Sequence, residues 1–144
     1  MRLALYKGTR PGMQGLYSRI TRWIDRGPYS HCEMVFSDGT SASSSYIDGG
    51  VRFKTIDYKP EHWDFIELPS YRENAARHWF RQHCGQPYDV WGNVRFLIGI
   101  AREEDGAWFC SEAVMAALGY SDGYRYGPNG MATLLKTVFP QGAM

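Results

Sequence analysis

Two Asp-Gly pairs divide the first half of this chain into short segments that have the character of β-strands. Asp38-Gly39 and Asp48-Gly49 each lie between two such segments, and an Asp-Gly pair in this position is the strongest local signal for a β-hairpin. The segments that follow residue 31 are therefore expected to pair as an antiparallel meander. The predicted strands are residues 3–6, 32–36, 41–46, 51–56 and 63–68.

The second half of the chain changes to patterns that are typical of helices. One predicted helix carries Cys110 in its first turn and stops at Gly119, a residue type that often follows a helix end. Asp89 is a candidate cap for another helix. The other predicted helices are residues 14–25, a helix that runs through residues 73–81 and ends near Cys84-Gly85, and residues 90–100. Strands followed by helices predict an α+β domain, with a small antiparallel sheet packed against helices.

The length and charge of the chain narrow its architecture and its partners. The sequence shows no break in composition over its 144 residues, which fits a single domain over residues 1–144. The formal net charge is +1, so nucleic acid is not expected as a partner. No apolar run reaches the roughly 18 residues that span a bilayer, and the first residues lack the apolar core of a secretion signal. We therefore expect synthesis in the cytoplasm without a signal peptide and without a membrane span.

The cysteines argue against a disulfide framework and against a metal centre. The chain has an odd number of cysteines without CxxC spacing: Cys32, Cys84 and Cys110. This pattern favours reduced thiols. His31, Glu33 and a cysteine could ligate zinc together, but the sequence contains no recognised ligand spacing. No metal and no cofactor are predicted.

Cys110 and His31 are the residues with the clearest chemical potential. In the first turn of a helix, the Cys110 thiolate would face free backbone N–H groups and the positive end of the helix dipole, which lower the pKa of a thiol. A cysteine and a histidine far apart in sequence are what a thiol hydrolase needs. The alternative is structural, because cysteine is often a small buried residue and histidine is often a hydrogen-bonded part of the core. Cys32 is expected to point away from His31, into the core.

Four short motifs accompany this pair in a distinctive order along the chain. The motifs are Tyr29-Ser30-His31, then Ser37-Asp38-Gly39 followed by Asp48-Gly49-Gly50-Val51, then Gly85-Gln86-Pro87-Tyr88-Asp89, and finally Phe109-Cys110-Ser111-Glu112. With its histidine strand ahead of its cysteine helix, the chain resembles the circularly permuted branch of the NlpC/P60 papain-like superfamily. The resemblance covers nearly the whole chain. More narrowly, the chain resembles small proteins of tailed phages and prophages.

The resemblance implies a cleft between the Cys110 helix and the His31 strand. Cys110 would attack a carbonyl as nucleophile, His31 would act as base and then as acid, and a thioester intermediate would form. Three classes of function stay open: an amidase or endopeptidase that cleaves bacterial cell-wall (peptidoglycan) peptides, an acyl-lipid or thioester hydrolase or acyltransferase, and a non-catalytic phage structural or binding protein. A phage enzyme of this kind would be virion-associated or released on lysis.

The residue that orients His31 has two candidates. In the permuted superfamily this residue lies on the next strand, and here that register falls on Ser43, which can accept a hydrogen bond but carries no charge. Glu33 is the other candidate, because a residue two positions beyond His31 on a strand projects from the same face. The same motifs make Tyr29, Tyr88 and Ser111 candidate substrate contacts.

Overall fold

The computed structural model describes residues 1–8, 19, 22, 26–91 and 106–142. In this part of the chain it contains one five-stranded sheet and three α-helices, so the predicted α+β class is confirmed. The strands are β1 (Arg2–Tyr6), β2 (His31–Val35), β3 (Ser41–Ser45), β4 (Gly50–Lys54) and β5 (Trp63–Glu67). The helices are α2 (Glu73–His83), α4 (Cys110–Ala117) and α5 (Pro128–Val138), and short 3-10 turns occupy Ser70–Arg72 and Gly123–Arg125.

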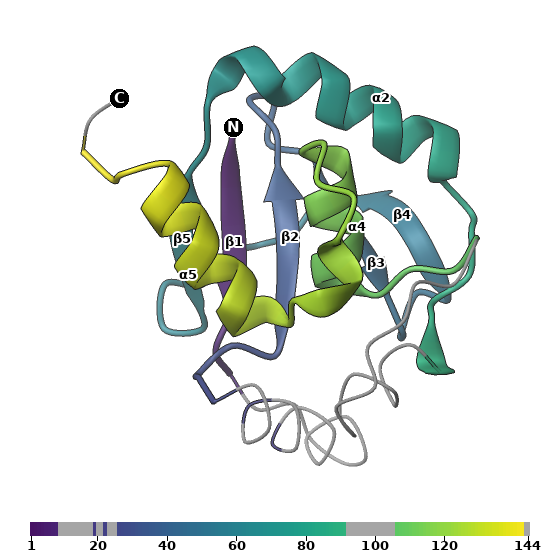
Figure 1. The fold of residues 1–144 in the computed structure, drawn as a ribbon, viewed down its shortest axis with the longest axis horizontal. Coiled ribbons are helices and arrows are strands. Elements are labelled where there is room, and N and C mark those ends of the chain that lie inside the picture. The colour runs from purple at the N-terminus through teal and green to yellow at the C-terminus, as the bar shows by residue number, and fades with distance from the viewer. Residues whose placement is uncertain (9–18, 20–21, 23–25, 92–105, 143–144) are drawn as a thin grey trace.

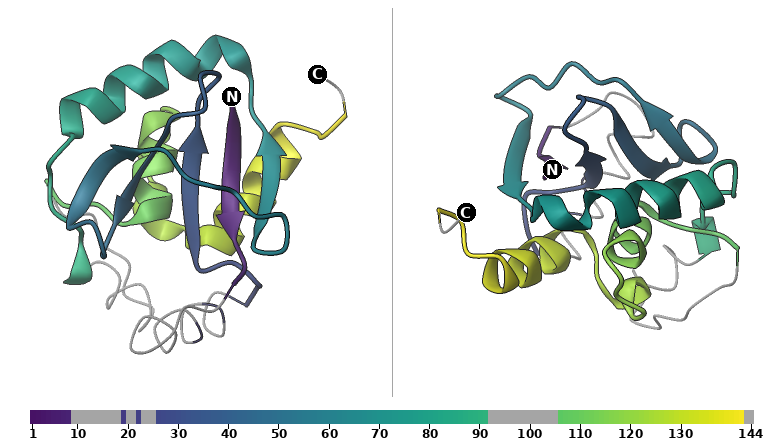
Figure 2. Two further views of the ribbon diagram at one scale, coloured as in Figure 1. Left: turned by 180° about the vertical axis from the view of Figure 1, so that it is seen from behind. Right: turned by 90° about the horizontal axis from the view of Figure 1, so that it is seen from above.

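All strand pairs in the sheet are antiparallel, and the strand order is β4-β3-β2-β1-β5. The predicted meander is confirmed for β2, β3 and β4, whose turns place Gly39 and Gly49 at φ values of +85° and +81°. It is wrong for β5, which pairs with β1 and not with β4. The connection 55–62 is long enough to cross one face of the sheet (Figure 2), and it brings Ile66 opposite Leu3, in the apolar core.

The helices and the β4–β5 connection lie on opposite faces of the sheet (Figures 1 and 2). Because side chains alternate along a strand, Leu5 and Met34 point to the helices and join the main core. Ala4 and Val35 point the other way and form a smaller apolar cluster with Trp63. The sheet therefore has two distinct faces. His31 is the first residue of β2, which is the middle strand of the sheet.

The predicted helices over residues 73–81 and 110–118 are confirmed as α2 and α4. The end of α4 is followed by Gly119 at a φ of +89°, the left-handed conformation that makes glycine favourable after a helix. The helices predicted over residues 14–25 and 90–100 lie largely outside the described residues.

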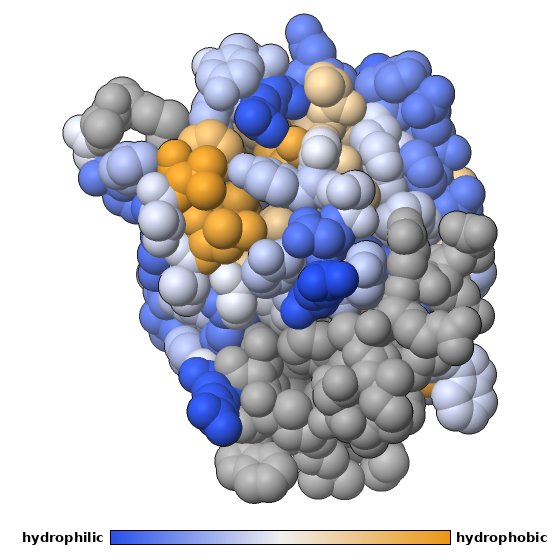
Figure 3. Space-filling view, in the orientation of Figure 1, coloured by the Kyte–Doolittle hydropathy of each residue, from blue (hydrophilic) through white to orange (hydrophobic). Residues whose placement is uncertain are grey.

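Helix α5 was not predicted from the sequence. Pro128 at its first turn is a typical helix start, and the buried Met131 and Leu135 have helical spacing, so both signals were present in the sequence. Hydrophobic surface gathers over α5 on the helical side of the molecule, where Val138 is exposed (Figure 3). No helix in the described ranges is both long enough and apolar enough to cross a membrane.

Candidate active site

Cys110 is the first residue of α4, as predicted. The preceding residue, Phe109, has an extended backbone that begins the helix, and its N–H group donates to Glu112 Oε2 at 3.3 Å. Such a contact satisfies one of the N–H groups that a helix start leaves free. Cys110 is only 5% exposed, and its helix packs against β2 and β3. The thiol therefore lies between the helical layer and the sheet.

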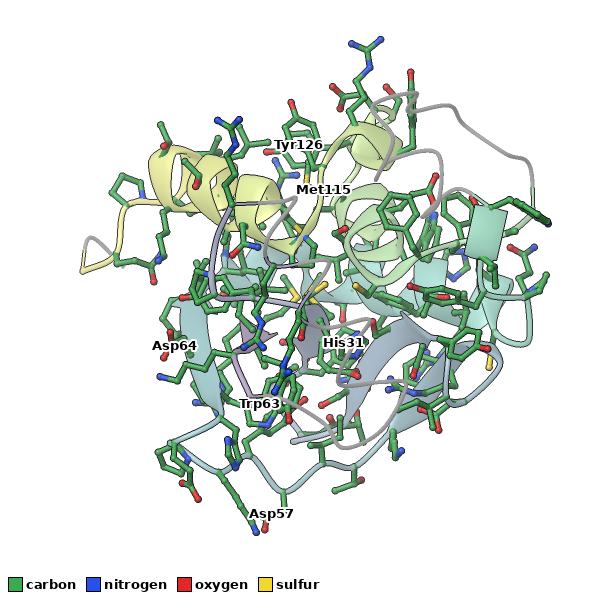
Figure 4. The ribbon with its side chains drawn as sticks, turned by 90° about the horizontal axis from the view of Figure 1, so that it is seen from below. His31, Asp57, Trp63, Asp64, Met115 and Tyr126 are labelled. Atoms are coloured by element: carbon green, nitrogen blue, oxygen red, sulfur yellow. The ribbon has the colours of Figure 1, made fainter. Side chains whose placement is uncertain are left out.

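His31 is the first residue of β2, and the residues before it are held by the neighbouring strand β1 and by helix α5. The preceding residue, Ser30, donates its N–H group to the Tyr6 carbonyl of β1 at 3.0 Å. One residue earlier, the backbone of Tyr29 exchanges two hydrogen bonds of 2.9 Å with the side chain of Asn129, on α5. In the view from below, His31 lies between Met115 and Tyr126 on the helical side and Trp63 on the other side (Figure 4).

Glu33 is the residue that contacts the His31 ring. Its Oε1 atom lies 2.7 Å from His31 Nε2, which leaves Nδ1 as the ring nitrogen that can meet the Cys110 thiol. The Glu33 side chain is only 1% exposed and also accepts two hydrogen bonds from the Arg52 guanidinium, at 2.7 and 2.6 Å. A buried carboxylate of this kind is stabilised by its paired bonds with arginine. These bonds from Arg52 and the contact with His31 hold the pKa of Glu33 below its ordinary value against the opposing effect of burial.

The pKa values of His31 and Cys110 move in opposite directions. Burial alone would lower the pKa of His31, but hydrogen bonds with Cys110 and with Glu33 outweigh it and raise that pKa to about 9. The pKa of Cys110 is well below its ordinary value, because a hydrogen bond with the Cys32 thiol, the nearby His31 ring and the Cys32 backbone N–H group together outweigh burial. At neutral pH the arrangement favours a thiolate beside an imidazolium.

Cys32 has a second role besides the one predicted for it. It is fully buried in the main core, and its strand position points it to the helical face, as the alternation of side chains predicts. Its contact with Cys110 was not predicted from the sequence. Burial raises the pKa of Cys32 well above its ordinary value, so this thiol keeps its proton and can donate it in a hydrogen bond to the Cys110 thiolate.

Ser43 does not contact His31. Its hydroxyl is fully buried and donates to the Cys32 carbonyl oxygen at 2.7 Å. Of the two candidates for orienting His31, the structure therefore brings Glu33 to the ring and directs Ser43 to the backbone of β2.

The three predicted substrate contacts lie at different places around this centre. The Tyr29 hydroxyl donates to Asp64 Oδ2 at 2.8 Å, and the Ser111 hydroxyl is buried and donates to the Tyr126 carbonyl at 2.7 Å. Tyr88 packs edge-on against Tyr46, with ring centroids 5.8 Å apart. Their contact with a substrate stays a prediction.

Arg52 is the residue of this centre that the sequence analysis missed. The signal that could have found it is its register, because Arg52 pairs with Ser43 across β3 and β4 and therefore projects from the same face as Glu33.

Within the described residues, no group of three or more His, Cys, Asp or Glu side chains could hold a metal ion. No protein-family model matches this chain, and no curated protein matches it. The chemistry of Cys110, His31 and Glu33 is therefore the basis on which a function can be argued.

Proposed function

We propose that this chain is a cysteine hydrolase in which Cys110 is the nucleophile, His31 is the general base and acid, and Glu33 orients His31. One observation carries the proposal: Glu33 Oε1 lies 2.7 Å from His31 Nε2 while the carboxylate itself is 1% exposed. Burying a charged carboxylate beside a partly buried histidine is unfavourable for stability compared with apolar packing. The arrangement is one that a general base needs, because the carboxylate orients the ring and stabilises its protonated form.

The first half of the reaction would form a thioester. The Cys110 thiolate attacks the carbonyl carbon of the substrate, and a C–S bond forms while the carbonyl oxygen becomes an oxyanion. His31 then gives its proton to the leaving amine or alcohol as the C–N or C–O bond breaks. The raised pKa of His31, about 9, keeps this proton on the ring at neutral pH until the leaving group takes it.

The second half would release the acyl group. His31, now neutral, takes a proton from water, and the resulting hydroxide attacks the thioester carbonyl. The C–S bond breaks, the acid product leaves and the Cys110 thiolate is restored beside the protonated ring. Backbone N–H groups at the start of α4 are the donors that would stabilise the oxyanion in both halves, an effect worth about 3 kcal/mol per donor in other hydrolases.

We also infer that the fold is the permuted papain-like fold and that the substrate is a peptide amide. The strand that carries His31 comes before the helix that carries Cys110, and this helix packs on that strand. The same order is the basis of the resemblance to permuted NlpC/P60 proteins, and it makes a cell-wall peptide the first substrate to test.

The first experiment is alkylation of the native protein with iodoacetamide from pH 5 to pH 9, with the modified cysteines mapped by mass spectrometry. We expect Cys110 to react at a pH well below 8.5, where an ordinary thiol is protonated. Cys84, which is exposed and free, serves as the reference cysteine for the alkylation rate within the same molecule. His31→Ala should abolish the selectivity for Cys110, whereas His78→Ala, at an exposed position on α2, should preserve it.

Two results would contradict the proposal. One is that Cys110 of the native protein reacts no faster than Cys84 at pH 6. Alkylation of the mildly denatured protein is the control that shows whether iodoacetamide can reach Cys110. The other is a selectivity that His31→Ala leaves intact. If the alkylation results are as expected, hydrolysis of peptide amides, acyl esters and thioesters is compared next, with Cys110→Ala as the inactive control.

A further inference from the structure

Arg52 reaches the active-site carboxylate from two strands away. The β2–β3 register pairs Met34 with Ala42, so the next positions, Glu33 and Ser43, lie side by side. Ser43 in turn pairs with Arg52 on β4. Neighbouring strands are about 4.8 Å apart, so the Arg52 side chain must cross about 10 Å, over β3, to meet Glu33.

The small side chain at position 43 makes this crossing possible. Ser43 lies beneath the path of Arg52, and its hydroxyl turns down to the Cys32 carbonyl, at 2.7 Å. All five residues of β3 are serine or alanine and all are buried. A larger side chain at position 43 would fill the space that the guanidinium uses. The small residue at position 43, on the face that Arg52 crosses, is thus explained by the side chain that passes over it.

The contact between Arg52 and Glu33 has the geometry of a fixed pair. Arg52 Nη1 donates to Glu33 Oε2 at 2.7 Å and Nη2 donates to Oε1 at 2.6 Å. The third donor, Nε, is held by Asp48 Oδ2 at 2.8 Å. Two parallel bonds to both oxygens fix the plane of a carboxylate, whereas a single bond does not.

The orientation of that plane decides where His31 lies. Glu33 Oε1 accepts from both Arg52 and His31 Nε2, so the two groups share one oxygen. If the carboxylate turned about its terminal bond, Oε1 would leave the imidazole and the ring would lose the partner that keeps Nδ1 available to Cys110.

We propose that Arg52 is a positioning residue of the active site: it clamps the Glu33 carboxylate so that Glu33 holds His31 in the orientation that serves Cys110. This inference rests on the proposed function, because it assigns Arg52 a part in the same reaction. Arg52 acts through Glu33 and makes no contact with the reacting atoms.

The charge of Arg52 also offsets that of Glu33 in the same buried cluster. Removing one positive charge raises the affinity of the neighbouring groups for protons, so the thiolate would form only at a higher pH. The other ionisable groups that face this cluster come from β1, β2, β4, α4 and the connections: they are Arg2, Tyr6, Cys32, Asp48, Lys54, Tyr58 and Cys110.

The test compares Arg52→Gln, Arg52→Lys and the control Lys54→Gln, which alters the neighbouring partner of Asp48 and leaves Glu33 untouched. The first readout is the imidazole Nε2–H proton of His31 in NMR spectra, which a hydrogen bond to Glu33 moves downfield and protects from exchange. The second is the pH profile of Cys110 alkylation. We expect Arg52→Gln to lose the protected proton and to react about tenfold more slowly than wild type at a pH on the acid side of the profile.

Arg52→Lys separates orientation from charge. Lysine keeps the charge but cannot make two parallel bonds, so the protected proton should be lost while the alkylation profile returns toward that of wild type. This variant also keeps the test decisive if Arg52→Gln does not fold. In a Glu33→Gln background, the further change Arg52→Gln should leave the NMR readout unchanged, because the residue through which Arg52 orients His31 is already absent, whereas the alkylation profile should still shift with the loss of the Arg52 charge.

The inference and the proposed function fail in different ways. A protected His31 proton that survives in both Arg52 variants would overturn the positioning role, even with a reactive Cys110. A wild-type Cys110 that behaves as an ordinary thiol would overturn the hydrolase proposal, while the NMR signal would still report whether Arg52 orients Glu33 and His31.

Discussion

Glu33→Gln is the substitution that tests most directly how the site raises the pKa of His31. The surroundings of the ring raise its pKa from the ordinary 6.5 to about 9, which corresponds to a few kcal/mol of stabilisation of the protonated ring. Cys110 contributes first to this increase and Glu33 second, against the effect of burial. A hydrogen bond to a charged group is worth about 1.5–3 kcal/mol. Glu33→Gln should therefore lower the pKa of His31 by about 1–2 units.

The assay is an NMR titration of the histidine rings, with the His31 signal assigned from His31→Ala. A second assay follows stability, by denaturant unfolding between pH 6 and pH 10. Because the folded-state pKa of His31 lies above its ordinary value, its contribution to stability is complete below about pH 6.5 and is lost as the pH rises through about 9. In Glu33→Gln this loss should be complete at a lower pH and be smaller.

Ser43→Ala is the matched control, because Ser43 was the other candidate for orienting His31. It removes the hydrogen bond to the Cys32 carbonyl and should cost about 1 kcal/mol of stability without moving the pKa of His31. Glu33→Gln also leaves Arg52 without its main partner, at a cost of about 3 kcal/mol, so Glu33→Asp is the variant to titrate if it does not fold. The reasoning is refuted if the pKa of His31 stays at its wild-type value in the Glu33 variants, or if it falls in Ser43→Ala.

The remaining predictions concern the neighbours of the site and the backbone that supports it. Cys32→Ala removes the thiol that donates to Cys110, so alkylation of Cys110 on the acid side of its pH profile should be about tenfold slower; an unchanged profile would exclude this hydrogen bond. Gly50→Ala should cost about 3 kcal/mol in denaturant unfolding, because a Cβ at this left-handed position collides with a backbone carbonyl, whereas Gly39→Ala, with open space around it, should cost only about 1 kcal/mol; equal costs would contradict the close approach at Gly50. Asn129→Ala should lower the free energy of unfolding by about 2–3 kcal/mol, since it removes two buried hydrogen bonds to the segment before β2, and a loss under 0.5 kcal/mol would mean that α5 does not anchor that segment.

The local features of this protein were predictable from its sequence because their causes are local. Turns at Asp38-Gly39 and Asp48-Gly49 need the left-handed backbone that glycine adopts freely. The start of α4 at Cys110 and the projection of Glu33 on the same side of β2 as His31 follow from the periodicities of helix and strand. Neighbouring residues thus determined the hairpins, the helix that bears the thiol, and Glu33 as one of the two candidates for orienting His31.

Only the tertiary structure decided which distant residues meet. The strand β5 crosses to the free edge of β1 because the connection 55–62 allows it and because Ile66 becomes buried there, and no short-range pattern encodes that choice. The contact between the Cys32 thiol and Cys110 likewise depends on the tertiary structure. Arg52 reaches Glu33 only because the registers of β2–β3 and β3–β4 place both residues on the same line across the sheet, with the small side chain of Ser43 between them. A strand pattern specifies which face a side chain takes, whereas its partner depends on the pairing of the whole sheet.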